Sequence, residues 1–172
     1  MTIHSDHPFV PPEGERDPLR RLRGRLPSPV TVWTTGSGAG REGLTISSLL
    51  VADGEPAHVL GLVDADSDFW DADPDSWVVN VLGSEHRFLA DAFAGTAPAP
   101  GGRFRLGSWT DSGWGPVLAD TAGWLGVRRV DAPPRHVGWG LLVEGVVEHV
   151  EVGAGEAMVH VRGRYRDIGS TP

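Results

Sequence analysis

The pattern of hydrophobic and polar positions is clearest in residues 29–52, where a two-residue alternation is broken by glycine and then resumes. Residues 30–35 read VTVWTT, so β-branched side chains and one tryptophan alternate along an extended backbone. Residues 36–40 read GSGAG, and their glycines supply the backbone freedom that a hairpin tip requires. Residues 43–48, GLTISS, predict the returning strand. We therefore expect an antiparallel hairpin whose second strand ends in a cluster of hydroxyl groups.

Apolar runs between turn-forming residues predict further strands along the rest of the chain. They lie at residues 57–63, 76–82, 122–130, 139–150 and 157–162. One helix is expected after Ser84, and its apolar stripe consists of Phe88, Leu89, Ala92 and Phe93. Residues 95–120 are rich in glycine and proline and predict a long surface excursion. Many strands with few helices favour a closed antiparallel barrel of the mainly β class.

A short helix is expected at the start of the domain. Asp17 suits the N-cap and Pro18 the first turn, and the helix must end before Pro27. Apolar side chains at helical spacing, Leu19, Leu22 and Leu26, predict a helix docked on the barrel with its arginines in solvent. The alternative is an RNA- or membrane-binding arm. Residues 1–16 are rich in proline and polar groups and predict a flexible arm ahead of a single domain at 17–172.

Composition narrows the class of protein and its partners. The 172-residue chain has a net charge of −8 and a pI near 5.2, which argues against a nucleic-acid partner, because such a partner requires a basic face. No apolar run approaches the roughly 20 residues of a membrane span and no signal peptide is evident, so we expect a cytoplasmic protein without a membrane partner. The absence of cysteine and lysine excludes disulfides, thiolate metal sites and Schiff-base chemistry. The histidines lack metal-binding spacing, so no metal site is predicted.

Several short motifs, taken in order, resemble one known family. Residues 43–48 (GLTISS) resemble its G-M-T-x-S-S, and residues 77–82 (WVVNVL) resemble its F-A-V-N-V-L. Residues 162–165 (RGRY) resemble its closing R-G-R-Y. The order and spacing of these motifs, between about Leu19 and Tyr165, are similar to those of the flavin reductase-like, FMN-binding split-barrel family.

The resemblance implies a fold, an activity and a set of contacts. The fold is a closed antiparallel split β-barrel with Greek-key connections and a few short helices. The activity is NAD(P)H-dependent reduction of FMN, or of FAD, for delivery to a partner monooxygenase or another acceptor, by a homodimer with the flavin at the subunit interface. The implied cofactor contacts are Thr45, Ile46, Ser47, Ser48, Ser67 and Asn80. The alternative is a non-catalytic flavin carrier, or a barrel that binds another planar ligand such as haem or a deazaflavin.

These side chains also have plain structural interpretations. Thr45, Ser47 and Ser48 supply hydroxyl and backbone N–H groups, and Asn80 supplies both a donor and an acceptor, which a flavin requires. Threonine and serine are nevertheless common in strands, and Asn80 would also satisfy a strand end.

Two features depart from the family pattern on the nicotinamide side. Where the family has G-D-H, this chain has Gly138-Trp139-Gly140, and the nearby His136 lies four residues early. The family's second histidine is replaced by Val161, and by strand alternation the adjacent His160 is expected to point to the opposite face. We therefore expect two polar contacts to be missing and assign no catalytic residue.

The loop at residues 64–75 is a further departure. It contains six aspartates around Ser67, the residue that matches the family's phosphate-binding threonine. Carboxylates repel a phosphate, so this loop is a poor phosphate site unless they are neutralised. Ser67 as the cap of an acidic helix N-terminus is the structural alternative. A calcium loop is disfavoured because Phe69 stands where an EF-hand requires glycine.

The chain contains seven tryptophans, and their positions predict two different roles. Those in predicted strands, Trp33, Trp77 and Trp124, are expected in the core. Those in loops or at strand ends, Trp70, Trp109, Trp114 and Trp139, are expected to stack on a ligand or to lie at a subunit interface.

Overall fold

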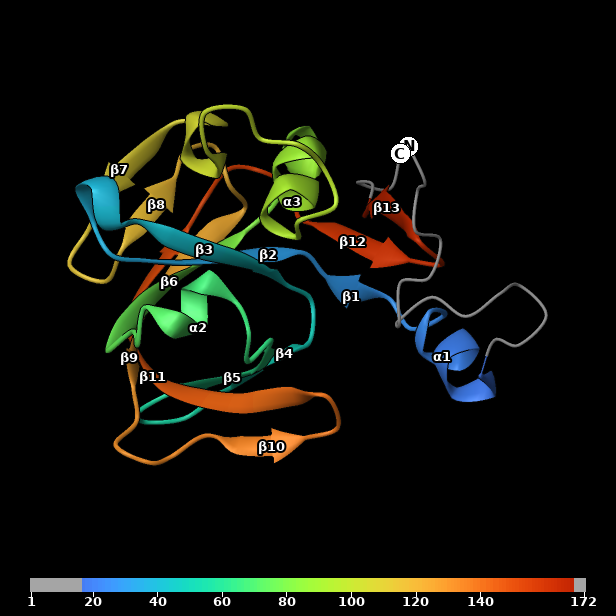
Figure 1. Ribbon diagram of the computed structural model, residues 1–172, viewed down its shortest axis with the longest axis horizontal. Coiled ribbons are helices and arrows are strands. Elements are labelled where there is room, and N and C mark those ends of the chain that lie inside the picture. The colour runs from blue at the N-terminus through green and yellow to red at the C-terminus, as the bar shows by residue number, and fades with distance from the viewer. Residues whose placement is uncertain (1–16, 169–172) are drawn as a thin grey trace.

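A curled antiparallel sheet with short helices around it forms the body of the computed structural model, which describes residues 17–168 (Figure 1). The sheet has eight strands, seven of them in the order β3-β2-β6-β9-β11-β5-β4, with β10 paired to β11. These strands are β3 (Glu42–Ile46), β2 (Thr31–Thr35), β6 (Ser76–Val81), β9 (Gly123–Arg129), β11 (Gly140–Val152), β5 (His58–Val63), β4 (Leu49–Ala52) and β10 (Arg135–Val137). The expected arm at residues 1–16 lies outside the described residues.

The two edge strands of this sheet are consecutive in the chain. β3 ends at Ile46 and β4 begins at Leu49, yet β3 pairs with β2 and β4 pairs with β5 at the opposite edge. The sheet must therefore curl until its edges meet at residues 47–48. The pairing of β4 with β5 extends to this bend, where the Leu62 N–H donates to the carbonyl of Ser48 at 2.9 Å. The predicted mainly β, antiparallel barrel is confirmed, and so is the hairpin formed by β2 and β3.

The core has two parts, one on each side of β2. Inside the barrel, the indoles of Trp33 and Trp77 are stacked with ring centroids 5.4 Å apart, and both are fully buried. Outside it, Val32 packs beneath α3 (Arg87–Phe93) in a second cluster that includes Phe93. Every residue of β2 is buried because both of its faces are covered. The expected core positions of Trp33 and Trp77 are thus correct, whereas Trp124 is only half-buried.

The segment at residues 95–120 is more ordered than the expected surface excursion. It forms a 3-10 turn, η3 (Arg103–Arg105), and a hairpin of β7 (Trp109–Asp111) and β8 (Pro116–Leu118). The rings of Phe104 and Trp109 pack against Phe93, so this segment covers the second core cluster. The structure therefore corrects this expectation: the glycines and prolines shape a covering layer, not a free loop.

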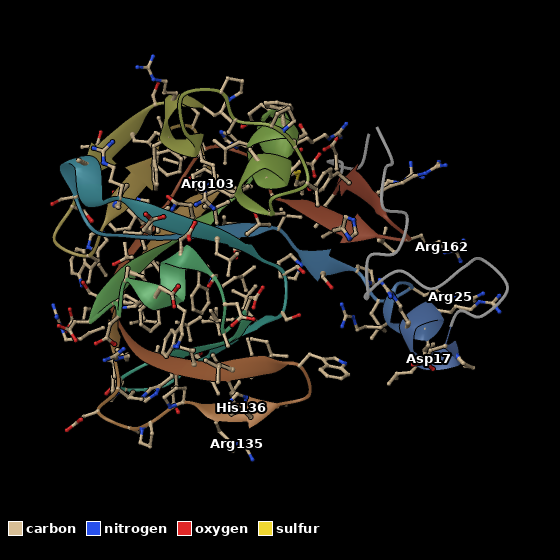
Figure 2. The ribbon with its side chains drawn as sticks, viewed as in Figure 1. Asp17, Arg25, Arg103, Arg135, His136 and Arg162 are labelled. Atoms are coloured by element: carbon tan, nitrogen blue, oxygen red, sulfur yellow. The ribbon has the colours of Figure 1, made fainter. Side chains whose placement is uncertain are left out.

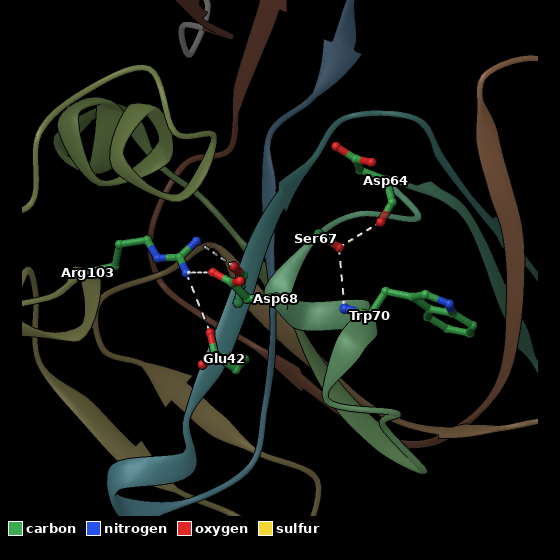
Figure 3. A network of polar contacts seen from close by, with 7 residues as sticks. Glu42, Asp64, Ser67, Asp68, Trp70 and Arg103 are labelled. Atoms are coloured by element: carbon green, nitrogen blue, oxygen red, sulfur yellow. Dashed lines mark hydrogen bonds and ion pairs between the residues drawn. The ribbon is translucent and has the colours of Figure 1, made fainter.

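Arg103 attaches this layer to the barrel (Figure 3). Its guanidinium donates to the Gly43 carbonyl at 3.2 Å and to the Asp68 carboxylate at 2.9 Å, and it also lies 3.5 Å from the Glu42 carboxylate. These partners belong to β3 and to α2 (Asp68–Asp71). One side chain therefore links the covering layer to two elements of the barrel.

The first helix forms as expected but does not dock. α1 (Pro18–Arg23) is capped by the Asp17 carboxylate, which accepts from the Leu19 N–H at 3.0 Å. No residue of α1 is buried, and its apolar stripe is mostly exposed: Leu19 by 69%, Leu22 by 58% and Leu26 by 59%. The expectation of docking is wrong because the helix stands to one side of the barrel (Figure 1). The Arg162 N–H donates to the Gly24 carbonyl at 2.6 Å and joins the end of α1 to the next sheet.

That sheet is small and separate from the barrel sheet. It has the order β1-β12-β13, and its strands are β1 (Ser28–Pro29), β12 (Met158–Val161) and β13 (Arg164–Asp167). The other expected helix begins later than predicted, because Ser84 starts the 3-10 turn η2 (Ser84–His86) that precedes α3. Phe88 is 52% exposed and does not belong to the buried stripe. None of the helices within residues 17–168 is long and apolar enough to cross a membrane.

Candidate functional site

A groove runs between α1 and the outer face of the barrel at β4 and β5. Its volume is about 730 Å³, within the range of roughly 300–1,000 Å³ that ligand sites occupy. Its lining consists of Arg20, Arg23, Gly24, Leu26, Pro27, Ser28, Pro29, Ser47, Ser48, Leu49, Leu50, Leu60, Gly61, Leu62, Leu142, His160 and Gly163. The groove therefore combines an apolar wall with a small number of polar groups.

The apolar wall comes from strand alternation. In β5, Val59 and Val63 point into the barrel core, so Leu60 and Leu62 point outward. Leu142 of β11 lies opposite Leu62 in the sheet and extends the same face. The result is an apolar surface that matches the face of a planar ligand.

The polar edge comes from the bend between β3 and β4. Ser47 and Ser48 lie at this bend, and both are exposed. Among the hydrogen bonds within residues 17–168, none uses either serine hydroxyl, whereas the carbonyl of Ser48 holds Leu62. The bend thus presents two hydroxyl groups at the rim of the apolar wall.

The charge of the lining is opposite to that of the protein. Arg20 and Arg23 lie three residues apart on α1 and therefore share one face of the helix, toward the groove. The described lining contains no carboxylate, although the whole chain carries 23 acidic residues. Sequence analysis missed these two arginines as site residues, because their spacing shows that they share a helix face but not which surface that face meets.

His160 lies on the side of β12 that faces the groove, which the sequence analysis did not anticipate. It lines the groove, and its ring meets that of Tyr165 edge-on with centroids 5.3 Å apart. Val161, the next residue of β12, does not line the groove, which agrees with the expected strand alternation. The groove lies on the His160 side because β12 pairs with β1 beside the end of α1 and not with the barrel sheet. His136, in contrast, is exposed and does not line the groove, and Figure 2 shows it on β10 at the lower edge of the barrel.

Two of the predicted site residues support the bend from within. The Thr45 hydroxyl donates to the Ala90 carbonyl of α3 at 2.6 Å, and Ile46 belongs to the barrel core with an exposure of 3%. Neither lines the groove. They fix the direction in which the chain reaches Ser47.

Asn80 is fully buried and its side chain is satisfied by the fold. Its Nδ2 donates to the Val32 carbonyl and to the Thr34 hydroxyl, each at 3.1 Å. Its Oδ1 accepts from the Leu118 N–H at 2.8 Å. The structure thus gives Asn80 the structural role and leaves no side-chain group of it at the groove.

Ser67 caps α2, as its structural interpretation predicted (Figure 3). Its hydroxyl accepts from the Trp70 N–H at 3.3 Å and donates to the Asp64 carbonyl at 2.7 Å. The surrounding carboxylates are partly neutralised, since Asp68 pairs with Arg103 and Asp73 lies 2.7 Å from Arg129. Of the six predicted residues, the structure therefore brings only Ser47 and Ser48 to the groove.

The perturbed titrating groups lie outside the groove. Burial and a hydrogen bond to Asp91 raise the pKa of Tyr165, so its hydroxyl remains a donor at neutral pH. A hydrogen bond from Arg128 lowers the pKa of Glu148, and a hydrogen bond from the Trp114 indole lowers it further. Nowhere in residues 17–168 do three metal-ligating side chains gather closely enough to hold a metal ion.

The family model, a curated relative and a solved structure that match this chain are all flavin reductases or flavin oxidoreductases. The family described as "Flavin reductase like domain" matches residues 23–169. The FMN reductase (NADH) RutF of Variovorax paradoxus (strain S110) is 30% identical over 166 residues, which cover 95% of this chain and 91% of that protein. The solved structure of the Streptomyces globisporus C-1027 NADH:FAD oxidoreductase SgcE6 has a TM-score of 0.78 and 26% identity, covering 94% of this chain and 100% of that one.

A further solved structure shares the fold at lower identity. It is BorF, the flavin reductase component of a bacterial two-component tryptophan halogenase, with a TM-score of 0.77 and 20% identity. The alignment covers 89% of this chain and 98% of that one. This likeness confirms the architecture of the barrel.

Proposed function

This chain belongs to the flavin reductase-like domain family, and on that premise we propose that it reduces FMN with NADH as the hydride donor. The family resemblance read from the sequence motifs is therefore confirmed. The observation that carries the proposal is the groove at the β3–β4 bend, which offers an apolar wall, two unengaged serine hydroxyls and a positive end. We place the reaction in the cytoplasm as part of the same proposal.

The residues of the groove fit a flavin. A flavin has a flat ring system with one polar edge and a ribityl chain that ends in phosphate, and it needs an apolar face and hydrogen-bond donors. Leu60, Leu62 and Leu142 provide the face, and Ser47 and Ser48 provide donors along its edge. When bound, the flavin supplies the hydride chemistry, and the chain orients it and excludes water from it.

The remaining predicted residues support this site indirectly. We assign Thr45 and Ile46 to holding the bend in place, through the Ala90 carbonyl and the barrel core respectively. Asn80 ties β2 to β6 and β8, so it preserves the barrel on which the groove is built. Ser67 maintains α2 beside the barrel. These four are positioning residues in this proposal.

A homodimer is part of the proposal. Apolar side chains remain exposed around the groove, including Leu26 at 59%, Leu50 at 61% and, on the β10–β11 turn, Trp139 at 94%. A second copy of the chain that covers this face would remove these side chains from water and close the groove. Light scattering at micromolar concentration should give twice the mass of the 18.4 kDa chain, and a monomeric mass contradicts the dimer.

The same proposal names a class of acceptor. BorF serves a halogenase as its flavin reductase component, and by analogy the reduced flavin made by this protein would pass to a flavin-dependent monooxygenase or halogenase.

The test is a visible spectrum followed by a steady-state assay. The purified protein should show flavin absorption, alone or after addition of FMN, and should oxidise NADH only when flavin is present. Flavin binding without NADH oxidation would favour the non-catalytic carrier. A haem or deazaflavin spectrum, or no flavin binding at all, would overturn the proposal.

A further inference from the structure

We propose that Arg20 and Arg23 of α1 form the subsite for a phosphoryl group of the bound nucleotide, the 5′-phosphate of the flavin being the first candidate. The inference rests on the proposed function, because it takes a flavin nucleotide as the occupant of the groove. It adds the residues that recognise the charged end of that nucleotide.

The first step is that these two guanidinium groups are not used by the fold. Five other arginines pair with carboxylates within 4 Å: Arg41 with Asp111, Arg87 with Asp167, Arg103 with Asp68, Arg128 with Glu148 and Arg129 with Asp73. In the stretch from 17 to 168, neither Arg20 nor Arg23 has an ion pair or a side-chain hydrogen bond. Their charges are therefore available to a ligand.

The second step is their placement. Both arginines line the groove from α1, and Ser47 and Ser48 line it from the barrel. A ligand whose ring lies on the leucine wall and whose edge contacts the serines would extend its tail toward the helix. Guanidinium groups bind phosphate through short, charge-assisted and often bidentate hydrogen bonds.

The third step is the contrast with the rest of the surface. The chain has a net charge of −8, and the loop at 64–75 alone carries six aspartates, while the lining of this groove carries none. The hydroxyl of Ser67 in that loop is already occupied by the cap of α2. A dianion would therefore be repelled at the acidic loop and attracted at the α1 end of the groove.

The same helix provides a matched control. Arg21 and Arg25 lie in or just after α1 and do not line the groove. The double variants Arg20→Gln/Arg23→Gln and Arg21→Gln/Arg25→Gln change the net charge equally, so long-range electrostatics is held constant between them. A third variant, Arg20→Lys/Arg23→Lys, keeps the charge but not the bidentate geometry, so its preference for FMN over riboflavin should lie between those of the unmodified protein and the glutamine variant.

The experiment compares FMN with riboflavin, which lacks the phosphate. Flavin-fluorescence titration of the unmodified protein should give tighter binding of FMN. Arg20→Gln/Arg23→Gln should lower that preference by roughly tenfold or more, because hydrogen bonds to charged groups are the strong ones, and should leave riboflavin affinity unchanged. The Arg21→Gln/Arg25→Gln variant should keep the preference. Urea midpoints of the variants should agree, which excludes a folding effect.

A second arm identifies the source of the phosphoryl group. If only the KM for NADH rises in Arg20→Gln/Arg23→Gln, the subsite holds the pyrophosphate of the dinucleotide. Identical FMN preference and identical KM for NADH in the two glutamine variants would overturn the subsite while the reductase function stands. No binding of either flavin by the unmodified protein would overturn the proposed function as well.

Discussion

Trp33 packs against Gly61 so closely that a β-carbon at Gly61 would lie 2.6 Å from the indole ring of Trp33. Trp33 is fully buried in the barrel core, whereas Gly61 also lines the groove on the outer face. One glycine backbone is therefore all that separates the core tryptophan from the candidate site. The groove and the barrel core share a wall, and the fold restricts the residue at that wall to glycine.

Gly61→Ala should destabilise the protein because the added methyl group has no space. Trp33 cannot move away, since it is fully buried and its ring is stacked on Trp77. Overpacking of this kind costs about 1–3 kcal/mol of the free energy of unfolding, measured by urea denaturation. Gly40→Ala is the matched control, because a β-carbon there meets nothing within 4 Å, and its effect should stay within about 0.5 kcal/mol. Equal effects of the two substitutions would contradict the tight contact.

Substitution of the exposed serines Ser47 and Ser48 should weaken flavin binding without changing stability. Ser47→Ala/Ser48→Ala removes hydroxyls that no described residue uses, so it should leave the urea midpoint unchanged. It should raise the Kd for FMN by roughly tenfold, since at least one hydrogen bond to the ligand is lost and each is worth about 0.5–1.5 kcal/mol, more if charged. An unchanged Kd would place the flavin elsewhere on the surface.

Asn80→Ala should behave in the opposite way. It leaves the buried Leu118 N–H and the Val32 carbonyl without the partner they now have. An unsatisfied buried group costs about 1–3 kcal/mol, so the free energy of unfolding should fall by that amount or more. The Kd for FMN, measured below the unfolding transition, should change less than in the serine variant. A large rise in Kd with normal stability would show that Asn80 contacts the flavin directly.

The sequence predicted the barrel better than it predicted the site, and particular residues show why. The alternation around Trp33 is a local pattern, and the two-residue period of a strand reports it directly. The positions of Arg20 and His160 depend on α1 and β12 lying beside the β3–β4 bend, although the three segments are distant in sequence. Such long-range placement leaves no local trace.

The docking of α1 failed as a prediction for a related reason. Leu19 and Leu22 have the spacing of an apolar stripe, but spacing does not say which surface the stripe meets. Within residues 17–168, the stripe stays mostly exposed and no residue of α1 is buried. The structural interpretation of Ser67 succeeded because helix capping is a local requirement. The side chain of Asn80 instead contacts Val32 and Leu118, which are distant in sequence, so the local pattern around Asn80 did not name its partners.

Glu148 predicts a pH dependence of stability. The pKa of Glu148 is lowered in the folded state, first by the hydrogen bond from Arg128 and then by that from the Trp114 indole. A carboxylate whose folded pKa is depressed contributes stability above its unfolded pKa and loses it as the pH falls through the folded pKa. The urea midpoint of the unmodified protein should therefore exceed that of Glu148→Gln at neutral pH. The difference should shrink below about pH 4.5; a difference that stays constant down to pH 3 would contradict this assignment.

His160 should contribute to the use of NADH, whereas His136 should not. His160 lines the groove beside Ser47 and Ser48, and His136 is exposed on β10, outside the lining. His160→Ala removes one group able to orient the nicotinamide or the flavin, and a lost orienting hydrogen bond costs about 0.5–1.5 kcal/mol. The kcat/KM for NADH should fall by roughly two- to tenfold, measured as NADH oxidation at saturating FMN.

His136→Ala serves as the control for this measurement and should retain full activity. His160→Asn keeps a polar group at the groove and should recover part of the loss, which a purely structural role of the ring against Tyr165 would not allow. If both alanine variants lose activity equally, the effect does not come from the groove. If only His136→Ala is impaired, the β10–β11 hairpin carries the nicotinamide contact, and the assignment of the groove by its lining is wrong.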